Sequence, residues 1–432
     1  MLAVMACIGS GQTAWGEEPA DAPEAATQAI APTPPAETLP DGSAPRPVRE
    51  VRALWVTRWD YTQPEHVRAI MANAASLGFN VVFFQVRGNA TVFYLSQHEP
   101  WAWELTGSDP SATGQDPGWD PLGLAVEEAH AHGLELHAYV NLLPGWRGAT
   151  PPPFASGQLY WTRPEWFMCN IAGRRMEAPG RERGAPRDWY AFLSPGIPEV
   201  REHLAAICVE IATKYSVDGL HFDYIRYPAE IRSAPEEYAE RAHRLGNWSY
   251  DPVSLARFSQ ETGLAGPEAD PEAWTRWRAR QVTETVRLIR QRVEAHRPGI
   301  IFSAAVIADP TDAYSKKFQD YLTWAEEGIL DMVVTMNYHA DIAVVRERAE
   351  QLIALRPARG RWVTGLGIGY GAQGVQEQIE LIRSMPFDGF SCFAYAFLFN
   401  RSSNHEPREL AEILRQSTFL RPALLPEGWR EP

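Results

Sequence analysis

The sequence has few cysteines, fewer basic than acidic residues, and no long apolar run. Its four cysteines, at positions 7, 169, 208 and 392, form no close pair and show no spacing typical of metal ligands. We therefore expect neither a disulfide framework nor a structural zinc site. Because a membrane-spanning helix needs about 20 consecutive apolar residues, we also expect no transmembrane span.

The net charge and the aromatic content indicate which classes of ligand the protein can bind. Forty Lys and Arg residues against 54 Asp and Glu residues give a formal net charge of −14. Nucleic-acid binding depends on a basic surface, so no nucleic-acid partner is expected. The chain is 45% hydrophobic, which suffices for a large core, and it carries 16 tryptophans. Tryptophans in loops favour flat, weakly polar ligands such as sugar rings.

The first 48 residues differ from the rest of the chain. Residues 1–9 are mostly apolar, and Ala14 and Gly16 place small residues where a signal peptidase would read them. We interpret residues 1–16 as a candidate signal peptide, although its basic start is missing and Cys7 leaves a lipoprotein site open; a cytoplasmic tail is the alternative. Residues 17–48, rich in Ala, Pro and Glu, predict a disordered linker.

Residues 50–420 show no further break in composition and are interpreted as one domain. Eight apolar, β-rich runs alternate with segments that carry helix signals, and they lie at residues 51–57, 80–87, 134–141, 219–224, 300–306, 332–338, 362–368 and 389–395. Eight such alternations predict an α/β fold, a (β/α)8 TIM barrel. A doubly wound open sheet is the alternative, but the glycine-rich loop expected after its first strand is absent.

Side-chain alternation indicates which residues line the barrel, because alternate residues of a barrel strand face the lumen and the helices. In the second, third and fourth runs the polar residues share one parity. This polar set comprises Gln85, Arg87, Asn89, Glu135, His137, Tyr139, Asn141, His221 and Asp223. Its members gather toward the carboxyl ends of the strands, the face where such barrels keep their active sites.

Asp223 is the strongest catalytic candidate. It lies near the end of the fourth run, shares the lumen parity with His221, and is followed by aromatic residues that can raise the pKa of a carboxyl group, as a general acid requires. We expect His221, Arg87 and Asn141 to position the carboxyl group and the sugar. The alternative is a structural carboxylate paired with Arg226 or Arg87.

A second catalytic carboxylate is not obvious. Asp60 and Asp309 follow the first and fifth runs, and Glu99 lies in the loop after the second. The seventh run ends among glycines with no carboxylate. The two lumen histidines and Asp223 could also hold a metal, but no His-x-His pair or second acidic ligand completes a set. No metal or other cofactor is therefore predicted.

Polar and aromatic residues near the strand ends are candidates for substrate binding. Hydrogen bonding or stacking to a sugar is expected from Asn89, Trp101, His137, Asn141, Tyr224, Asn337, Tyr338 and Tyr395. Each of the polar residues could equally be a lumen residue whose hydrogen bonds are satisfied within the protein. Further stacking candidates lie in loops, at Trp59, Trp103, Trp146, Trp161 and Trp189.

Several motifs in order resemble the bacterial glycosyl hydrolase-like 10 family. They lie at residues 52–56, 80–87, 99–101, 120–122, 128–130, 133–141 and 218–224, followed by Tyr227 and Pro228. The resemblance covers about residues 50–400. It implies a (β/α)8 barrel, a secreted or envelope location, and hydrolysis of glycosidic bonds in a bacterial polysaccharide.

A weaker likeness links residues 218–225 to the acidic strand of family 18 chitinases, and Met336-Asn337-Tyr338 to their sixth strand. Relative to that pattern, His221 replaces the first aspartate after the glycine and Ile225 replaces the acidic glutamate, whereas Asp223 is retained. The chitinase assignment of the acid therefore fails here. Assistance by a substrate N-acetyl group would explain the missing second carboxylate.

Together these features predict an exported glycoside hydrolase that acts on a polysaccharide or oligosaccharide, with N-acetylhexosamine-containing cell-wall glycans favoured. The expected location is the periplasm, the cell envelope or the extracellular space. Asp223 would be the general acid or the carboxylate that orients an acetamido group. The alternatives are a non-catalytic carbohydrate-binding barrel and a metal-dependent carbohydrate deacetylase.

Overall fold

The computed structural model describes residues 46–107, 109–178, 190–228, 248–401 and 405–429. Residues from Pro47 onward form one compact unit. The candidate signal peptide at 1–16 and nearly all of the predicted linker at 17–48 lie outside the described residues. Both stay predictions.

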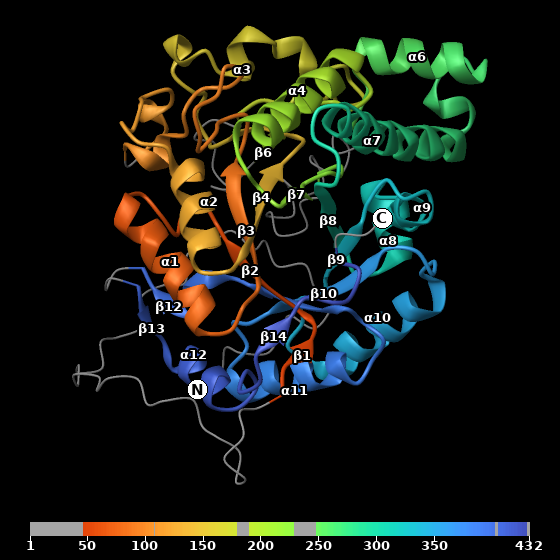
Figure 1. The fold of residues 1–432 in the computed structure, drawn as a ribbon. Helices are drawn as coiled ribbons and strands as arrows, with labels where there is room; N and C mark the ends of the chain where they lie inside the picture. The colour runs from red at the N-terminus through yellow and green to blue at the C-terminus, as the bar shows by residue number, and fades with distance from the viewer. Residues whose placement is uncertain (1–45, 108, 179–189, 229–247, 402–404, 430–432) are drawn as a thin grey trace, which may run out of the picture. The chain divides into compact units, whose positions relative to one another are not determined.

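Eight parallel strands close into a barrel in the order β10-β11-β2-β3-β4-β7-β8-β9 (Figure 1). Their bounds are β2 Val51–Val56, β3 Val81–Arg87, β4 Glu135–Asn141, β7 Gly219–Asp223, β8 Ile301–Ile307, β9 Met332–Met336, β10 Arg361–Gly367 and β11 Gly389–Phe393. Each coincides with one of the eight apolar runs. The predicted (β/α)8 barrel is confirmed, because strands buried on both faces read as near-continuous apolar runs.

Helices follow the strands and pack around the barrel. The main ones are α1 Pro64–Ser76, α2 Pro121–Ala131, α4 Pro198–Lys214, α7 Pro271–Glu294, α8 Pro310–Lys317, α9 Tyr321–Glu326, α10 Ile342–Leu355 and α11 Ala372–Arg383, with α3 Leu159–Thr162, α6 Pro252–Thr262 and α12 Glu409–Gln416 beside them. Four of the α-helices described start at an Asp-Pro pair, at Asp120, Asp251, Asp270 and Asp309. Each aspartate accepts a backbone N–H of the first turn, and the proline needs no partner there.

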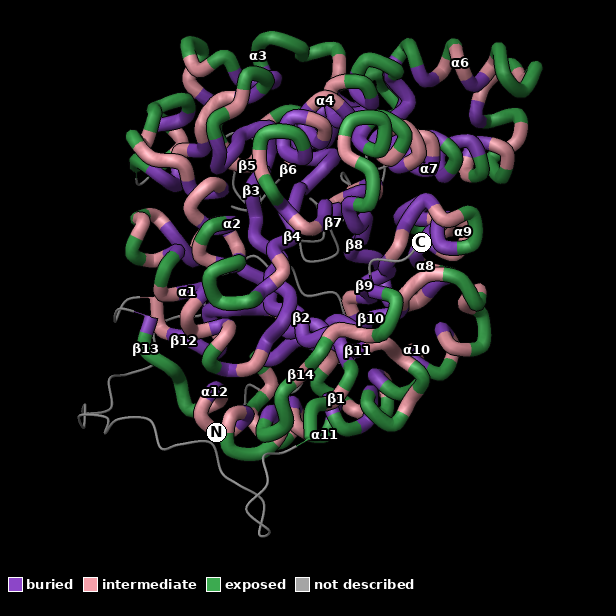
Figure 2. The backbone as a smooth tube through the Cα atoms, in the orientation of Figure 1, coloured by how far each residue is buried: buried purple, intermediate pink, exposed green. Residues whose placement is uncertain are grey.

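The strands are buried along almost their whole length, as Figure 2 shows in purple. One apolar cluster fills the lumen and includes Trp55, Phe83 and Tyr139, whereas a larger one, with Val82 and Phe84, lies between strands and helices. The Trp55 ring meets the rings of Phe83 and Tyr139 edge-on at 5.2 and 5.0 Å. The lumen is therefore a packed core, with the chemistry confined to its rim.

The two ends of the compact unit meet beneath the barrel. β1 (Val48–Arg49) pairs with β14 (Ala423–Leu424) in parallel. Trp429 belongs to the lumen cluster, and its indole N–H donates to Glu135 at 2.7 Å. The last described residues thus close the amino-terminal end of the barrel.

The loops on the opposite face are more elaborate. After β3, the chain forms the short 3-10 helices η1 Trp103–Leu105 and η2 Pro110–Ala112. After β4, β5 (Pro144–Arg147) pairs antiparallel with β6 (Tyr190–Phe192). The connection between them carries α3 and the 3-10 helices η3 Phe154–Ser156 and η4 Pro164–Trp166. Near the C-terminus, β12 (Phe399–Asn400) pairs with β13 (Glu406–Pro407), and η6 (Tyr395–Phe397) follows β11.

Candidate active site

Asp223 is the last residue of β7 and lies at the carboxyl end of the barrel with 5% of its surface exposed. Its Oδ1 accepts the Tyr224 backbone N–H at 2.5 Å and the Arg226 guanidinium at 2.7 Å. Its Oδ2 accepts the Tyr139 hydroxyl at 3.0 Å. Tyr224 has a φ of +49°, and this left-handed turn accompanies the short-range pairing of Arg226 with Asp223.

The pKa values of the Tyr139 phenol and the Arg226 guanidinium are both raised, so both groups keep their protons and remain hydrogen-bond donors. Burial, and then the Asp223 charge, raise the pKa of the Tyr139 phenol well above its ordinary value. Burial disfavours the charged form of Arg226, but the charge and hydrogen bond of Asp223, together with Tyr224 and Tyr139, outweigh burial and raise the pKa of the guanidinium. Three fixed donors therefore hold the carboxylate in one orientation. Asp223 does form the ion pair with Arg226 that the structural interpretation predicted. The pair is also compatible with a catalytic role, because it fixes the orientation of the carboxylate.

Two groups of aromatic rings lie near Asp223. Tyr224 lies beneath the Arg226 guanidinium at 4.4 Å and meets the Tyr190 ring at 5.2 Å. In the second group Tyr338 stacks on Phe393 at 5.3 Å. The charge of Asp223 adds to burial in raising the pKa of the Tyr338 phenol, which places this ring near the carboxylate. All four rings are partly exposed, as surfaces that stack on sugars must be.

A buried polar cluster beside these rings was not predicted from the sequence. Arg58, in the loop after β2, donates to Asn89 at 2.9 Å and to the Tyr190 hydroxyl at 3.0 Å, and it pairs with Glu104 at 3.3 Å. Burial raises the pKa of the Glu104 carboxyl group despite the Arg58 charge. Within the described ranges, Asn89 Nδ2 is buried without a hydrogen-bond partner.

Trp59 lies over this cluster. The Arg58 guanidinium lies 4.9 Å from its ring centre, and the Trp103 ring meets it at 5.8 Å. The only sequence signal was an arginine and a tryptophan directly after the first strand. The cluster supplies a second carboxylate, Glu104, on the same face as Asp223.

His221 belongs to the packed lumen. Its ring stacks on Phe83 at 4.0 Å, meets Trp55 edge-on at 4.7 Å, and has Nδ1 2.7 Å from the Ser303 hydroxyl. Burial, and then the neighbouring His137, lower its pKa well below the ordinary value, so it is neutral. His221 has the lumen parity that the sequence predicted, but it packs in the core and its hydrogen bond goes to Ser303, not to Asp223. Its positioning role stays a prediction.

Arg87 does not face the lumen, which corrects its predicted role. A register shift between Gln85 and Arg87 sets Arg87 opposite Val140, whose side chain packs in the outer cluster. The guanidinium donates to both oxygens of Glu99 at 2.7 Å and to the backbone carbonyls of Asn141 and Leu142 at the end of β4. Burial opposes the charge of Glu99, yet Arg87 and His203 lower its pKa to about 2. Arg87 and Glu99 form a buried structural ion pair.

Four predicted substrate-binding residues lie away from Asp223. His137 contacts Glu135 at 3.3 Å near the closed end of the lumen. Asn337 donates to a carbonyl of α10, and Tyr395 bonds to Asn73 and His405 at 3.0 Å. Trp101 packs against the outer apolar cluster. These side chains make contacts within the fold, although His137 Nδ1 and Asn337 Oδ1 are buried without a hydrogen-bond partner among the described residues. Their role in substrate binding stays a prediction.

The structure does bring other predicted residues together. Tyr224 and Tyr338 flank Asp223, and Asn89 joins the Arg58 cluster. Asn141 pairs in register with Asp223, and its buried amide oxygen has no hydrogen-bond partner among the described residues. The other two carboxylates considered from sequence support local structure. Asp60 accepts two bonds from Thr57, and Asp309 caps α8.

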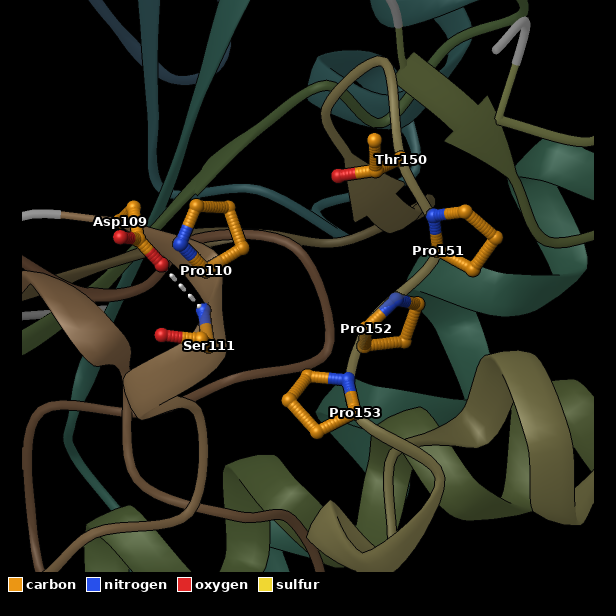
Figure 3. Close-up of a pocket in the computed structure, with 7 residues that line it drawn as sticks. All are labelled: Asp109, Pro110, Ser111, Thr150, Pro151, Pro152 and Pro153. Atoms are coloured by element: carbon orange, nitrogen blue, oxygen red, sulfur yellow. Dashed lines mark hydrogen bonds between the residues drawn. The ribbon is translucent and has the colours of Figure 1, made fainter.

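A cavity of about 460 Å³ opens elsewhere, between the loop at Asp109–Ser111 and the proline run after β5 (Figure 3). Asp109, Pro110, Ser111, Thr150, Pro151, Pro152 and Pro153 line it. None of them contacts Asp223 or the Arg58 cluster in any recorded interaction, and Asp109 bonds to Ser111 at 2.8 Å. The candidate site is the group of side chains around Asp223 at the carboxyl end of the barrel.

Two general features concern metals and membranes. The described residues bring no three His, Cys, Asp or Glu side chains together as a group able to hold a metal ion. Over the same ranges, no helix is both long and apolar enough to cross a bilayer.

Comparison with solved structures agrees with the barrel. The glycoside hydrolase domain of PgaB (BpsB) from Bordetella bronchiseptica matches with a TM-score of 0.57 and 16% identity, over 85% of this chain and 98% of that one. The catalytic domain of a β-amylase from Paenibacillus polymyxa matches with a TM-score of 0.55 and 11% identity, over 85% and 97% of the two chains. At such identities the likeness concerns the fold alone.

Sequence comparison adds the family. Glycosyl hydrolase DigH of Escherichia coli is 25% identical over 348 residues, which is 71% of this chain and 69% of that protein. Glycosyl hydrolase YngK of Bacillus subtilis is 25% identical over 323 residues, 67% of this chain but only 54% of that protein. The family model described as Glycosyl hydrolase-like 10 matches residues 50–380. The chain belongs to the glycosyl hydrolase-like 10 family.

Proposed function

We propose that the protein is an exported glycoside hydrolase that cleaves O-glycosidic bonds in a polysaccharide, with N-acetylhexosamine-containing cell-wall glycans as the favoured substrate. The observation that carries the proposal is the Asp223 carboxylate, held by three donors at the rim of the barrel near two groups of partly exposed aromatic rings. Family membership and the names of the relatives support a carbohydrate substrate.

The geometry favours one of the two predicted roles for Asp223. A carboxylate that accepts from Tyr139, Tyr224 and Arg226 is oriented as an acceptor rather than as a proton donor. In the candidate site it would accept the N–H of a substrate acetamido group and stabilise positive charge that develops at the sugar ring. The acetamido oxygen would then attack the anomeric carbon while the bond from that carbon to the glycosidic oxygen breaks. The leaving oxygen would take a proton from a water molecule, and a second water would open the cyclic intermediate and restore the acetamido group. Such assistance needs no nucleophilic carboxylate from the protein.

Incubation of the purified protein with defined glycans tests this proposal through the appearance of new reducing ends. The panel should contain a glycan with N-acetylated sugars and the same glycan after removal of its acetyl groups. We expect cleavage of the acetylated form only. Equal cleavage of both would refute the acetamido role, and binding without any cleavage would favour the non-catalytic carbohydrate-binding barrel.

Export is proposed from residues 1–16 alone. Fractionation of cells that express the full chain tests it. Recovery of the protein with the envelope or the medium is expected, and recovery with the cytoplasm would refute it.

A further inference from the structure

Arg147 ends β5, and among the described residues no hydrogen bond or ion pair is formed with its guanidinium, although its charge acts on Glu104. Instead, the guanidinium carbon lies 5.2 Å from the ring centre of Trp59 and 5.8 Å from that of Tyr190. The residue is partly exposed. Two aromatic faces thus hold a charged, planar donor group in place while its N–H groups keep capacity for a further partner.

The two neighbouring arginines behave differently. Arg58 pairs with Glu104, and Arg226 pairs with Asp223. Among the described residues, this part of the candidate site therefore holds three guanidinium groups and two carboxylates. Burial also raises the pKa of Glu104 against the charges of Arg58 and Arg147. A chain with a net charge of −14 thus has a local excess of positive charge where it would meet its substrate.

We propose that Arg147 binds a carboxylate group of the glycan and makes the enzyme selective for acidic glycans. This proposal rests on the glycoside hydrolase function proposed above. A carboxylate matches the planar fork of a guanidinium and carries the single negative charge that balances the local excess. Tyr190 contacts both Arg147 and Tyr224, so the acidic sugar lies next to the sugar held at Asp223.

Two sources of carboxylate fit this chemistry, namely the ring carboxylate of a uronic acid and a lactyl ether on a hexosamine. The experiment therefore uses one oligosaccharide of each kind, and each is paired with a copy whose carboxyl groups have been reduced to alcohols. The ratio of kcat/KM for the acidic form to that for the reduced form is the quantity measured. Equilibrium binding, followed by tryptophan fluorescence, gives the same ratio without cleavage.

We expect wild type to prefer at least one acidic oligosaccharide over its reduced copy by roughly 10- to 100-fold, which is what charged hydrogen bonds supply. Arg147→Gln should bring that ratio close to one, and Arg147→Lys should leave part of it. Arg163→Gln is the matched control, because Arg163 also lies over a tryptophan, Trp166 at 5.5 Å, but in another loop. It should keep the wild-type ratio. The preference should shrink as salt is raised.

The result that overturns the proposal is a wild-type ratio near one for both oligosaccharides, or a ratio that survives Arg147→Gln. If neither oligosaccharide is cleaved, the hydrolase function fails for these substrates, but the binding ratio still decides the role of Arg147. A preference in binding that is lost only in Arg147→Gln supports it, and the absence of any preference in binding refutes it.

Discussion

Replacing Asp223 with Asn changes the charge at the centre of the candidate site and almost nothing else. The amide oxygen can keep the position of Oδ1, where it accepts from the Tyr224 N–H and from Arg226. The amide nitrogen then takes the position of Oδ2, and the Tyr139 hydroxyl can rotate to accept from it. All three hydrogen bonds have a counterpart in the variant, so the loss is confined to the charge.

The cost in stability follows from that geometry. A hydrogen bond to a charged group contributes about 1.5–3 kcal/mol and a neutral one about 0.5–1.5 kcal/mol. Asp223→Asn should therefore lower the free energy of unfolding by about 1–2 kcal/mol. Removing one partner of a buried ion pair outright costs about 3–5 kcal/mol. A domain of ordinary stability, about 5–15 kcal/mol, stays folded after the smaller loss.

Activity should fall much further than stability. If the Asp223 carboxylate orients the substrate or stabilises its developing charge, turnover should drop by about two to four orders of magnitude. Urea unfolding and reducing-end assays on the same preparations measure the two effects. Asp388→Asn is the control, because Asp388 accepts the Trp362 N–H at the opposite end of the barrel, and turnover should stay at the wild-type rate. A folded Asp223→Asn variant with normal turnover would refute the assignment.

Three further predictions concern stability. Glu99→Gln should cost about 3–5 kcal/mol without lowering kcat of the folded protein, because both oxygens of Glu99 accept from Arg87 and the amide nitrogen would face a donor that cannot accept, unlike the Tyr139 hydroxyl at Asp223. Since the folded-state pKa of Glu99 is lowered to about 2, wild type should lose this stabilisation as pH falls from about 4.5 toward 2, and urea unfolding of the variant should lack that loss. The pKa of His221 is also lowered, so the unfolded chain binds its proton first and stability should fall below about pH 6.5; His221→Phe should flatten the unfolding free energy between pH 7 and 5. Deletion of residues 1–45 should leave the melting temperature unchanged, and a lower value would place the domain boundary earlier.

The barrel could be predicted because its signals are local. Each strand is a short apolar run, and the Asp-Pro pairs that start α2, α6, α7 and α8 combine a side-chain cap with a residue that needs no N–H partner. Neither signal depends on which strands become neighbours. Alternation along the strands was equally reliable for His137, Tyr139 and His221, which all lie in the lumen.

Alternation failed at Arg87 for a structural reason. One extra residue near the end of β3 reverses the face of the side chains beyond it, and a single sequence gives no sign of such a bulge. The second limit on the prediction was the position of each lumen residue along the barrel axis. His137 and His221 share the lumen with Tyr139, but only residues near the strand end reach the candidate site. Alternation along a strand predicts whether a side chain faces the lumen or the helices, but it does not predict how deep in the lumen the side chain lies.

The Arg58 cluster could not be predicted for a third reason. Arg58, Glu104 and Tyr190 come from three loops that follow β2, β3 and β4, and loops have no period from which an orientation can be inferred. Tyr190 reaches the candidate site only because β6 folds back on β5. Such contacts depend on the tertiary arrangement of segments that are far apart in the sequence.

The layer of aromatic rings around Trp55, which lies beneath Asp223, explains how few residues can fix the orientation of the carboxylate. Trp55 fills the middle of the lumen and meets the rings of Phe83, Tyr139 and His221. Tyr139 therefore has its ring fixed in the packed core and its hydroxyl on Asp223. Because close-packed interiors resist displacement, the hydroxyl of Tyr139 has a fixed orientation. For the role proposed for Asp223, such prior orientation is the condition for electrostatic stabilisation of a transition state. His221 belongs to the same ring layer, where it stacks on Phe83. Because burial lowers its pKa, it is neutral and adds no charge below the carboxylate.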